Sequence, residues 1–205
     1  MAAEGTRPAH RPSRKQALVD AAILLFTTRP VDSVTAAEIA REAGMTPAAL
    51  YYHFHSKDEL LVETLRAFGE DFETQVRAAR RRHGSEPDGL RAAVVDLLRW
   101  VLLAHPARSL LYFVTSSGLN LQVEQLRRQQ RGEIVMALRA LLLQHHRSMS
   151  APEAGVVAAA LVSLFEVAAA LPQGDDQRAE MLVDLGADLA VQAADGGDTA
   201  DALAG

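Results

Sequence analysis

The chain has 205 residues, a net charge of −5 and no cysteine. This length suits one large helical domain, or a small head joined to a larger body, and the missing thiols exclude disulfides and cysteine nucleophiles. Apolar residues make up 49% of the chain and aromatic residues only 5%, so we expect a core of Leu, Ala and Val, which favours helices. No apolar run reaches the roughly 20 residues that span a bilayer, so we expect a soluble, cytoplasmic protein without a membrane partner.

The N-terminal segment divides into an irregular stretch and a helix. Residues 1–12 are rich in Pro, Arg and Ala and show no periodicity, so they are predicted to form a disordered arm. Ser13 can cap a first helix. Apolar residues then recur at helical spacing until the pattern stops before Pro30.

Two short helical patterns follow, one on each side of a glycine. Thr35 and Glu38 form a capping box for the first pattern, which ends near Gly44. Thr46 can cap the second pattern, with Pro47 at the first helical position, where proline is favoured. This layout is typical of a helix-turn-helix, whose second helix enters the major groove of DNA. We therefore predict a helix-turn-helix DNA-binding domain over residues 13–55.

The rest of the chain reads as a helical body over residues 56–194. Ser56 and Glu59 form another capping box at the start of a long helix, which runs to a Gly- and Pro-containing break at residues 84–89. Further helical segments are predicted over residues 90–104, 110–119, 124–149, 152–171 and 175–193. Residues 195–205 are predicted to be a disordered tail. The predicted fold class is all-α, with about nine helices and no strand.

The head resembles the TetR family of transcriptional regulators over about the first 65 residues. The residues that carry the resemblance are Thr35, Ile39, Ala40, Ala43, Gly44, Thr46, Leu50, Tyr51, Tyr52, His53, Phe54, Lys57, Glu59 and Leu60. Ala48 departs from the pattern, because the family often has glycine there. The resemblance implies that a three-helix head reads DNA. It also implies that the body, residues 56–194, binds an effector and forms a homodimer through its last two helices.

The expected DNA-binding residues lie in and around the second helix of the motif. Tyr51, Tyr52 and His53 are consecutive and fan around the helix, so at least one of them must be exposed to a phosphate or a base. Small side chains can offer only van der Waals contact to bases, so specificity is expected to draw partly on Tyr52, the arm and DNA shape. The resemblance adds a phosphate contact for Lys57. The full predicted set is Thr35, Thr46, Pro47, Ala48, Ala49, Tyr51, Tyr52, His53 and Lys57.

The charge of the reading head is not basic. Residues 30–66 carry three basic and six acidic side chains, whereas residues 1–29 carry five basic and two acidic ones. Phosphate contacts are therefore expected from the arm, from helix N-termini and from neutral donors such as Thr and Tyr. We expect modest non-specific affinity and a shallow dependence of DNA binding on salt.

Polar-tipped and aromatic residues inside apolar segments of the body are the candidates for effector contact. They are Arg99, Trp100, Tyr112, Phe113, Asn120, Phe165 and Glu166. Arg99 stands among apolar neighbours, so it is expected to be partly buried and to need an anion, either a ligand group or Glu166. The pocket is expected to be mainly apolar and to take a small hydrophobic effector.

The favoured hypothesis is a homodimeric repressor of a near-palindromic operator, released by such an effector. One alternative is a ligand-independent regulator or activator on the same fold. Another is a helical small-molecule-binding protein or enzyme that no longer uses its DNA-binding head. No clustered acid–base pair indicates catalysis, and the adjacent His145 and His146 make a poor chelate. No catalytic residue, metal or cofactor is therefore predicted.

Overall fold

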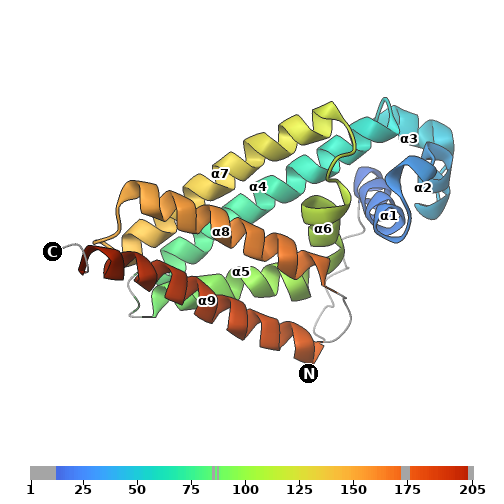
Figure 1. Cartoon of the computed structure of the whole chain (residues 1–205). Helices are drawn as coiled ribbons and strands as arrows, with labels where there is room; N and C mark the ends of the chain where they lie inside the picture. Colours follow the sequence, from blue (N-terminus) through green and yellow to red (C-terminus); the bar gives the residue numbers. More distant parts are fainter. Residues whose placement is uncertain (1–12, 85, 87, 172–175, 203–205) are drawn as a thin grey trace, which may run out of the picture. The chain divides into compact units, whose positions relative to one another are not determined.

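The computed structural model describes residues 13–84, 86, 88–171 and 176–202, so the predicted arm lies outside the described residues. Within the described residues all regular structure is helical, which confirms the all-α prediction and its nine α-helices. The chain divides into two compact units, residues 1–61 and residues 62–205. The division lies a few residues beyond the predicted boundary between residues 55 and 56. The elements are labelled in Figure 1.

The N-terminal unit contains α1 (Arg14–Thr28), the short 3₁₀ turn η1 (Val31–Ser33), α2 (Ala36–Glu42) and α3 (Pro47–His53). Its core is built from apolar residues that are at least 99% buried: Leu18, Ala22, Phe26, Val34, Ile39, Ala40, Leu50, Phe54, Leu60 and Leu61. These side chains come from α1, α2, α3 and the start of α4 (Lys57–His83). The core therefore fixes the two helices of the motif against α1.

The predicted helix ends of this unit are present. The Ser13 hydroxyl accepts a hydrogen bond from the Gln16 N–H at 3.1 Å, and Thr46 caps α3 with Pro47 in its first turn. Gly44 has φ +68°, in the left-handed region where a side chain is costly. The Met45 N–H reaches back to the Ala40 carbonyl at 2.7 Å, which satisfies a carbonyl at the end of α2.

The second unit is a bundle made by most of α4 and by α5 (Gly89–Arg99), η2 (Trp100–Ala104), α6 (Pro106–Leu110), η3 (Leu111–Thr115), α7 (Leu121–His145), α8 (Ala151–Ala170) and α9 (Asp176–Ala202). Helix α8 packs against α7 and α9, and α9 also packs along α5 (Figure 1). The Gln130 side-chain amide of α7 donates to the Arg66 carbonyl of α4 at 2.8 Å. The interior of this unit is thus closed by helices that are distant in sequence.

Several helix boundaries differ from the sequence-based ones. The segments predicted at residues 90–104 and 110–119 each change from α-helix to a π-helical stretch, η2 and η3. Asn120 caps α7 by accepting from the Val123 N–H at 2.9 Å, so this helix starts earlier than the predicted residue 124. Helix α9 continues to Ala202, into the range predicted as a disordered tail. The predicted stop at Pro172 lies outside the described residues.

An aromatic cluster forms the centre of the second unit. Phe68 and Phe72 of α4 meet Trp100 of η2, with ring centroids 5.1 and 5.5 Å apart. Phe68 also packs against Tyr112 at 4.9 Å, and Phe72 packs against Phe165 of α8 at 5.1 Å. Aromatic pairs at these separations stabilise a core beyond their buried area. The cluster therefore fixes both π-helical stretches against α4.

Helix α8 is long and apolar enough to cross a membrane by length and composition alone. In the structure it is a packed helix of the bundle, with one side buried through residues such as Ala158, Leu161 and Phe165. Its other side keeps Val156 and Val167 exposed. This amphipathic arrangement is typical of a helix that covers a protein core and also presents an apolar surface.

Candidate DNA-binding head and body pocket

The helix-turn-helix is anchored by a hydrogen-bonded network around Glu38. The Glu38 N–H donates to the Thr35 hydroxyl at 3.2 Å, and the Thr35 N–H donates to the Glu38 carboxylate at 2.8 Å, which completes the capping box. Arg29, just after α1, binds the other carboxylate oxygen at 2.8 Å. Hydrogen bonds from Arg29 and then Thr35 lower the pKa of Glu38 to about 2. The network ties the start of α2 to the end of α1.

The predicted DNA-binding residues form an exposed set on this unit. Thr35, Thr46, Pro47 and Ala48 are exposed, and Ala49 is half-buried. They occupy the two helix starts of the motif and the first turn of α3. The first turn of α3 therefore presents small side chains, as the sequence-based interpretation requires for direct van der Waals contact with bases.

The aromatic end of α3 is strongly exposed. Tyr52 is 85% exposed and Tyr51 is 56% exposed, while His53 is half-buried and lies edge-on to the Tyr52 ring. Two phenol hydroxyls are thus available beside the helix that would read DNA. Large exposed aromatics of this kind usually mark a binding surface.

The side chain of Lys57 is held by the protein and is not freely solvated. Its ammonium group donates to the Val31 carbonyl at 2.8 Å and is partly buried. An ammonium group has three N–H donors, so two remain for another acceptor such as a phosphate oxygen. The contact holds η1 against the start of α4 and fixes the place where Lys57 offers its charge.

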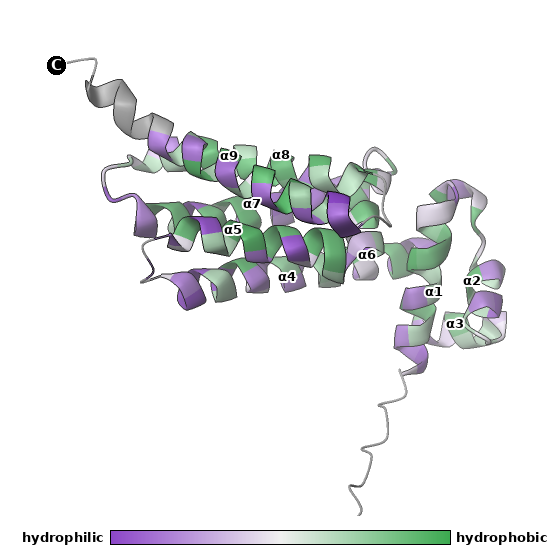
Figure 2. Cartoon of the chain, turned by 90° about the horizontal axis from the view of Figure 1, so that it is seen from below, coloured by the Kyte–Doolittle hydropathy of each residue, from purple (hydrophilic) through white to green (hydrophobic). Residues whose placement is uncertain are grey.

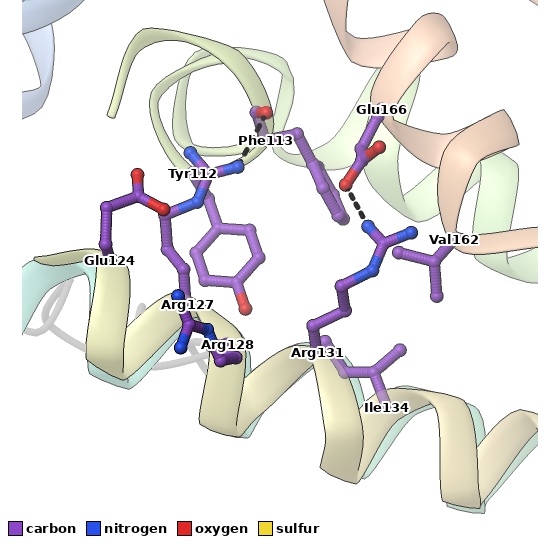
Figure 3. A pocket seen from close by; sticks show the side chains of 9 residues that line it. All are labelled: Tyr112, Phe113, Glu124, Arg127, Arg128, Arg131, Ile134, Val162 and Glu166. Atoms are coloured by element: carbon purple, nitrogen blue, oxygen red, sulfur yellow. Dashed lines mark hydrogen bonds and ion pairs between the residues drawn. The ribbon is translucent and has the colours of Figure 1, made fainter. Parts of the chain in front are cut away.

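The second unit contains a cavity of about 220 Å³ between η3, α7 and α8 (Figure 3). Its lining residues are Tyr112, Phe113, Glu124, Arg127, Arg128, Arg131, Ile134, Val162 and Glu166. Phe113, Ile134 and Val162 form its apolar wall. The five ionisable groups make the cavity more charged than the sequence-based expectation of a mainly apolar pocket.

The arginines of the cavity have different partners. Arg131 forms an ion pair with Glu166. Arg127 donates to the Ser116 hydroxyl at 2.9 Å and to the Phe113 carbonyl at 3.3 Å, which are both uncharged acceptors. Arg127, Arg128 and Arg131 all come from α7 and line the cavity, with the guanidinium of Arg127 beside the Phe113 carbonyl and that of Arg131 across the cavity beside Glu166 (Figure 3).

The structure brings together three of the seven residues predicted to contact an effector: Tyr112, Phe113 and Glu166. Phe165 packs in the aromatic cluster, and Asn120 serves as the cap of α7. Trp100 packs in the same cluster and also lines, with Arg99, a separate and more open surface pocket. The three arginines of α7 were missed. Their i, i+1 and i+4 spacing was visible in the sequence, but an Arg- and Gln-rich segment is ordinarily read as a solvated helix face.

The expectation for Arg99 was wrong. Its side chain is 51% exposed and pairs with Glu180 of α9 at 2.9 Å, so it is neither partly buried nor a partner of Glu166. The guanidinium takes its anion from a helix that lies 81 residues further along the chain. Glu166 is paired with Arg131 instead. Among the described residues, it is therefore not Arg99 but Arg127 of α7 that lacks a carboxylate partner.

An N-terminal unit that holds two short capped helices around a left-handed glycine contains a helix-turn-helix, the motif whose second helix enters the major groove of DNA. The family model described as "Bacterial regulatory proteins, tetR family" matches residues 18–64. Over these residues the chain is similar to the regulators of that family.

Curated relatives are similar to part of the chain. The chain is 39% identical over 83 residues to the HTH-type transcriptional regulator BetI of Agrobacterium fabrum, a match that covers 40% of each protein. It is 45% identical over 56 residues to the regulator of the same name from Rhizobium meliloti, covering 27% of this chain and 28% of that one. The chain thus matches less than half the length of these relatives.

Solved structures extend the similarity of fold to the body. The fatty acid degradation regulator FadR from Bacillus halodurans has a TM-score of 0.69 at 13% identity and covers 89% of this chain and 96% of its own. AibR, solved in complex with isovaleryl coenzyme A and operator DNA, has a TM-score of 0.64 at 21% identity and covers 84% of this chain and 97% of its own. At these identities the similarity concerns the fold alone.

Proposed function

We propose that this chain is a homodimeric, cytoplasmic transcriptional repressor that binds a near-palindromic DNA operator and is released by a small effector with a largely apolar body. The observation that carries the proposal is the exposed helix-turn-helix surface on a rigid frame, with Tyr51 and Tyr52 exposed and α3 fixed by the buried Leu50 and Phe54. Thr46 and the small first turn of α3 leave room for close approach to a groove.

Dimerisation is supported by exposed apolar residues on the last two helices. Val156 and Val167 are exposed on α8, and Met181, Leu185 and Leu189 are exposed at i, i+4 and i+8 of α9 (Figure 2 shows the hydropathy along these helices). Residues at this spacing form one stripe of a helix. Because α8 and α9 pack against each other, a second copy could cover both stripes in one two-fold interface.

A dimer also meets a geometric requirement of DNA reading. Two heads must lie about 34–36 Å apart to enter adjacent major grooves on one face of the duplex. Helix α4 begins in the first unit and continues through the second. A ligand that binds the body more tightly in one arrangement of α4 would shift the population of head spacings and so weaken DNA binding.

A second candidate function on the same fold does not involve DNA binding. The cavity beside Tyr112 favours a helical small-molecule-binding protein that no longer uses its head. No group of three or more His, Cys, Asp and Glu residues that could hold a metal occurs among the described residues. The function proposed is non-enzymatic, in line with the regulators that the chain resembles. A third possibility on the same fold is a DNA-binding regulator that does not respond to a ligand or that activates transcription.

The decisive experiment is fluorescence anisotropy with labelled DNA from the region beside the gene, compared with a scrambled duplex at physiological salt. Saturable binding with two protomers per site and at least about a 100-fold preference for the genuine sequence is expected. A double variant, Tyr51→Ala with Tyr52→Ala, should abolish that preference while keeping the helical circular dichroism signal. Equal, weak binding of the two duplexes would contradict the proposal and favour the small-molecule-binding alternative.

A further inference from the structure

We propose that the cavity between η3, α7 and α8 is a binding site for a compact organic oxyanion, a carboxylate or a phosphate monoester attached to a small apolar group. The role of this anion as the effector rests on the proposed function, whereas the binding site does not. The site is defined by the charges, the Tyr112 hydroxyl and the apolar walls of the cavity.

The cationic end of the cavity is not neutralised by the protein. Three arginines and two glutamates line it, and Arg131 and Glu166 compensate each other. Glu124 accepts from the Gly118 N–H at 2.7 Å. Arg127 has only uncharged acceptors, and neither it nor Arg128 lies within ion-pair distance of a carboxylate in the described part of the chain. A half-buried guanidinium without an anion is costly, so the cavity favours a ligand that supplies one.

A tyrosine hydroxyl opens into the same cavity. Tyr112 is only 4% exposed as a residue, and its side chain lines the cavity. In Figure 3 its hydroxyl projects from η3 into the space between Arg127 and Arg131. Burial raises the pKa of Tyr112, so the phenol remains protonated at neutral pH and can donate. The hydroxyl is therefore placed to donate a hydrogen bond to an acceptor that enters the cavity.

The geometry of the arginines suits an oxyanion better than a neutral polar group. Arg127 is held by the Ser116 hydroxyl and the Phe113 carbonyl, so its guanidinium is fixed before a ligand arrives. A guanidinium presents several N–H groups in one plane and can bind two oxygens of a carboxylate or phosphate together. Arg128 is exposed at the rim, where its charge can attract an anion from solvent.

The remaining walls set the size and polarity of the rest of the ligand. Phe113, Ile134 and Val162 are apolar and line the side away from Arg128. A cavity of about 220 Å³ is smaller than the pockets that take drug-sized ligands, which hold roughly 300–1,000 Å³. The site therefore fits an acid with a short aliphatic or single-ring body. This places an anionic head on the largely apolar effector of the proposed function.

The test is isothermal titration calorimetry of the whole chain with matched probes. Hexanoate, benzoate and phenylacetate are compared with hexanol, benzyl alcohol and 2-phenylethanol, and with 2-phenylethylamine as the cationic analogue. We expect at least one acid to bind about tenfold or more tightly than its alcohol, and the amine not to bind. Phenyl phosphate is a separate arm, and its affinity relative to phenylacetate shows which oxyanion source the site prefers.

Variants assign the binding to the cavity. Arg128→Gln and Tyr112→Phe should each weaken binding of the acid about three- to tenfold and leave binding of the alcohol unchanged. Arg127→Lys keeps the charge but loses the planar fork, so it should weaken the acid less than Arg127→Gln does. Arg81→Gln, an exposed arginine of α4 outside this cavity, is the matched control and should have no effect. A thermal melt of each variant establishes that it is folded.

Two outcomes would overturn the site: no acid binds more tightly than its alcohol, or the Arg127, Arg128 and Tyr112 variants all bind the acid like the unchanged chain. The effector role is measured separately, by adding the bound acid to the DNA complex in the anisotropy assay. Acid binding by a chain that ignores DNA would contradict the proposed function while upholding the site. Specific DNA binding by a chain that binds no acid would contradict the oxyanion site and uphold the proposed DNA-binding function.

Discussion

Gly44 carries the turn of the helix-turn-helix through its backbone alone. Its φ of +68° lies in the left-handed region, and a Cβ added there would meet no atom within 4 Å. We expect Gly44→Ala to destabilise the head by about 1–2 kcal/mol, because only the backbone strain changes. Gly132→Ala is the matched control. Gly132 lies inside α7 with equal space but without a positive φ, so this change should stabilise by about 0.5–1 kcal/mol.

Urea denaturation followed by circular dichroism measures both glycine variants. Opposite signs of the change in unfolding free energy would support the backbone explanation. A stabilising Gly44→Ala would contradict it.

Tyr52 is the exposed side chain of α3 that is best suited to a directed contact with DNA. Its hydroxyl can donate to a phosphate or a base, whereas Ala48 and Ala49 offer only methyl groups. We expect Tyr52→Phe to weaken operator binding about fivefold, the loss of roughly one hydrogen bond. Ala48→Gly and Ala49→Gly should change discrimination between operator and scrambled DNA by less. The idea fails if the two glycine variants abolish discrimination while Tyr52→Phe has no effect.

At the scale of elements, the end of α4 is joined to α5 by a charged cluster. His83 lies between Glu86 and Asp96, at 2.8 and 2.9 Å, and Arg82 also binds Asp96. Burial lowers the pKa of His83, but the hydrogen bonds that its ring N–H groups donate to the two carboxylates outweigh this effect and raise its pKa above the ordinary value of 6.5. The cluster's stabilisation is therefore fully present below pH 6.5 and is lost as the pH rises through the folded-state pKa.

We expect Asp96→Asn to lower the free energy of unfolding by about 1 kcal/mol at pH 6 and by less at pH 8.5. Burial lowers the pKa of the neighbouring His145, so its titration opposes that of His83 below neutral pH. The free energy of unfolding of the variant is subtracted from that of the unchanged chain at each pH, and the change of this difference with pH reports the His83 contribution. Asp184→Asn, in the exposed pair with Arg91, is the control. A loss that is equal at both pH values would show that the charge of His83 contributes nothing.

The proposed dimer surface is a prediction about α8 and α9 as a pair. Leu185 is 56% exposed within the α9 stripe, and Met136 of α7 is 59% exposed outside it. We expect Leu185→Glu to raise the dimer dissociation constant about 100-fold, because it buries an unpaired charge at the interface. Met136→Glu should leave the dimer intact. Sedimentation velocity over a range of protein concentrations measures both, and equal behaviour of the two variants would rule out this surface.

At the scale of the whole molecule, DNA binding depends on few cations. In the described head, Arg29 is paired with Glu38, Lys57 is held by a carbonyl and Lys15 lies over the Phe54 ring. Arg14 and Arg41 are exposed cations, and Lys57 keeps its charge because a carbonyl does not neutralise it. Three per protomer, or six per dimer, predict a slope of log K against log salt of about −5, with the two arginines of residues 1–12 adding up to about −4 more.

The salt prediction is checked by anisotropy titrations between 50 and 300 mM salt, which cover the range where counterion release governs affinity (roughly 50–200 mM and just above). The double variant Arg7→Gln with Arg11→Gln should make the slope shallower by about 2–4. Arg77→Gln with Arg81→Gln, on the body, is the control of equal charge. A slope unaffected by the first pair would show that residues 1–12 make no phosphate contact.

Local chemistry was readable from the sequence because it acts over a few residues. The caps Ser13, Thr35 and Thr46 and the left-handed Gly44 were predicted from residue type and spacing, and all are present. The family pattern lies in the same stretch, and the family model matches residues 18–64. Each of these features is determined by residues within about one turn of the helix end.

The body pocket was decided by tertiary structure, because its residues meet only when η3, α7 and α8 pack. Arg99 was assigned a buried role from its apolar neighbours, yet the packing of α9 gives it Glu180 at the surface. Arg127 and Arg131 look like solvated positions on an isolated helix, but the packing of η3 and α8 encloses them with Tyr112 and Glu166. Helical periodicity indicates which face of a helix is apolar, whereas the partner of each charged side chain depends on helices tens of residues away.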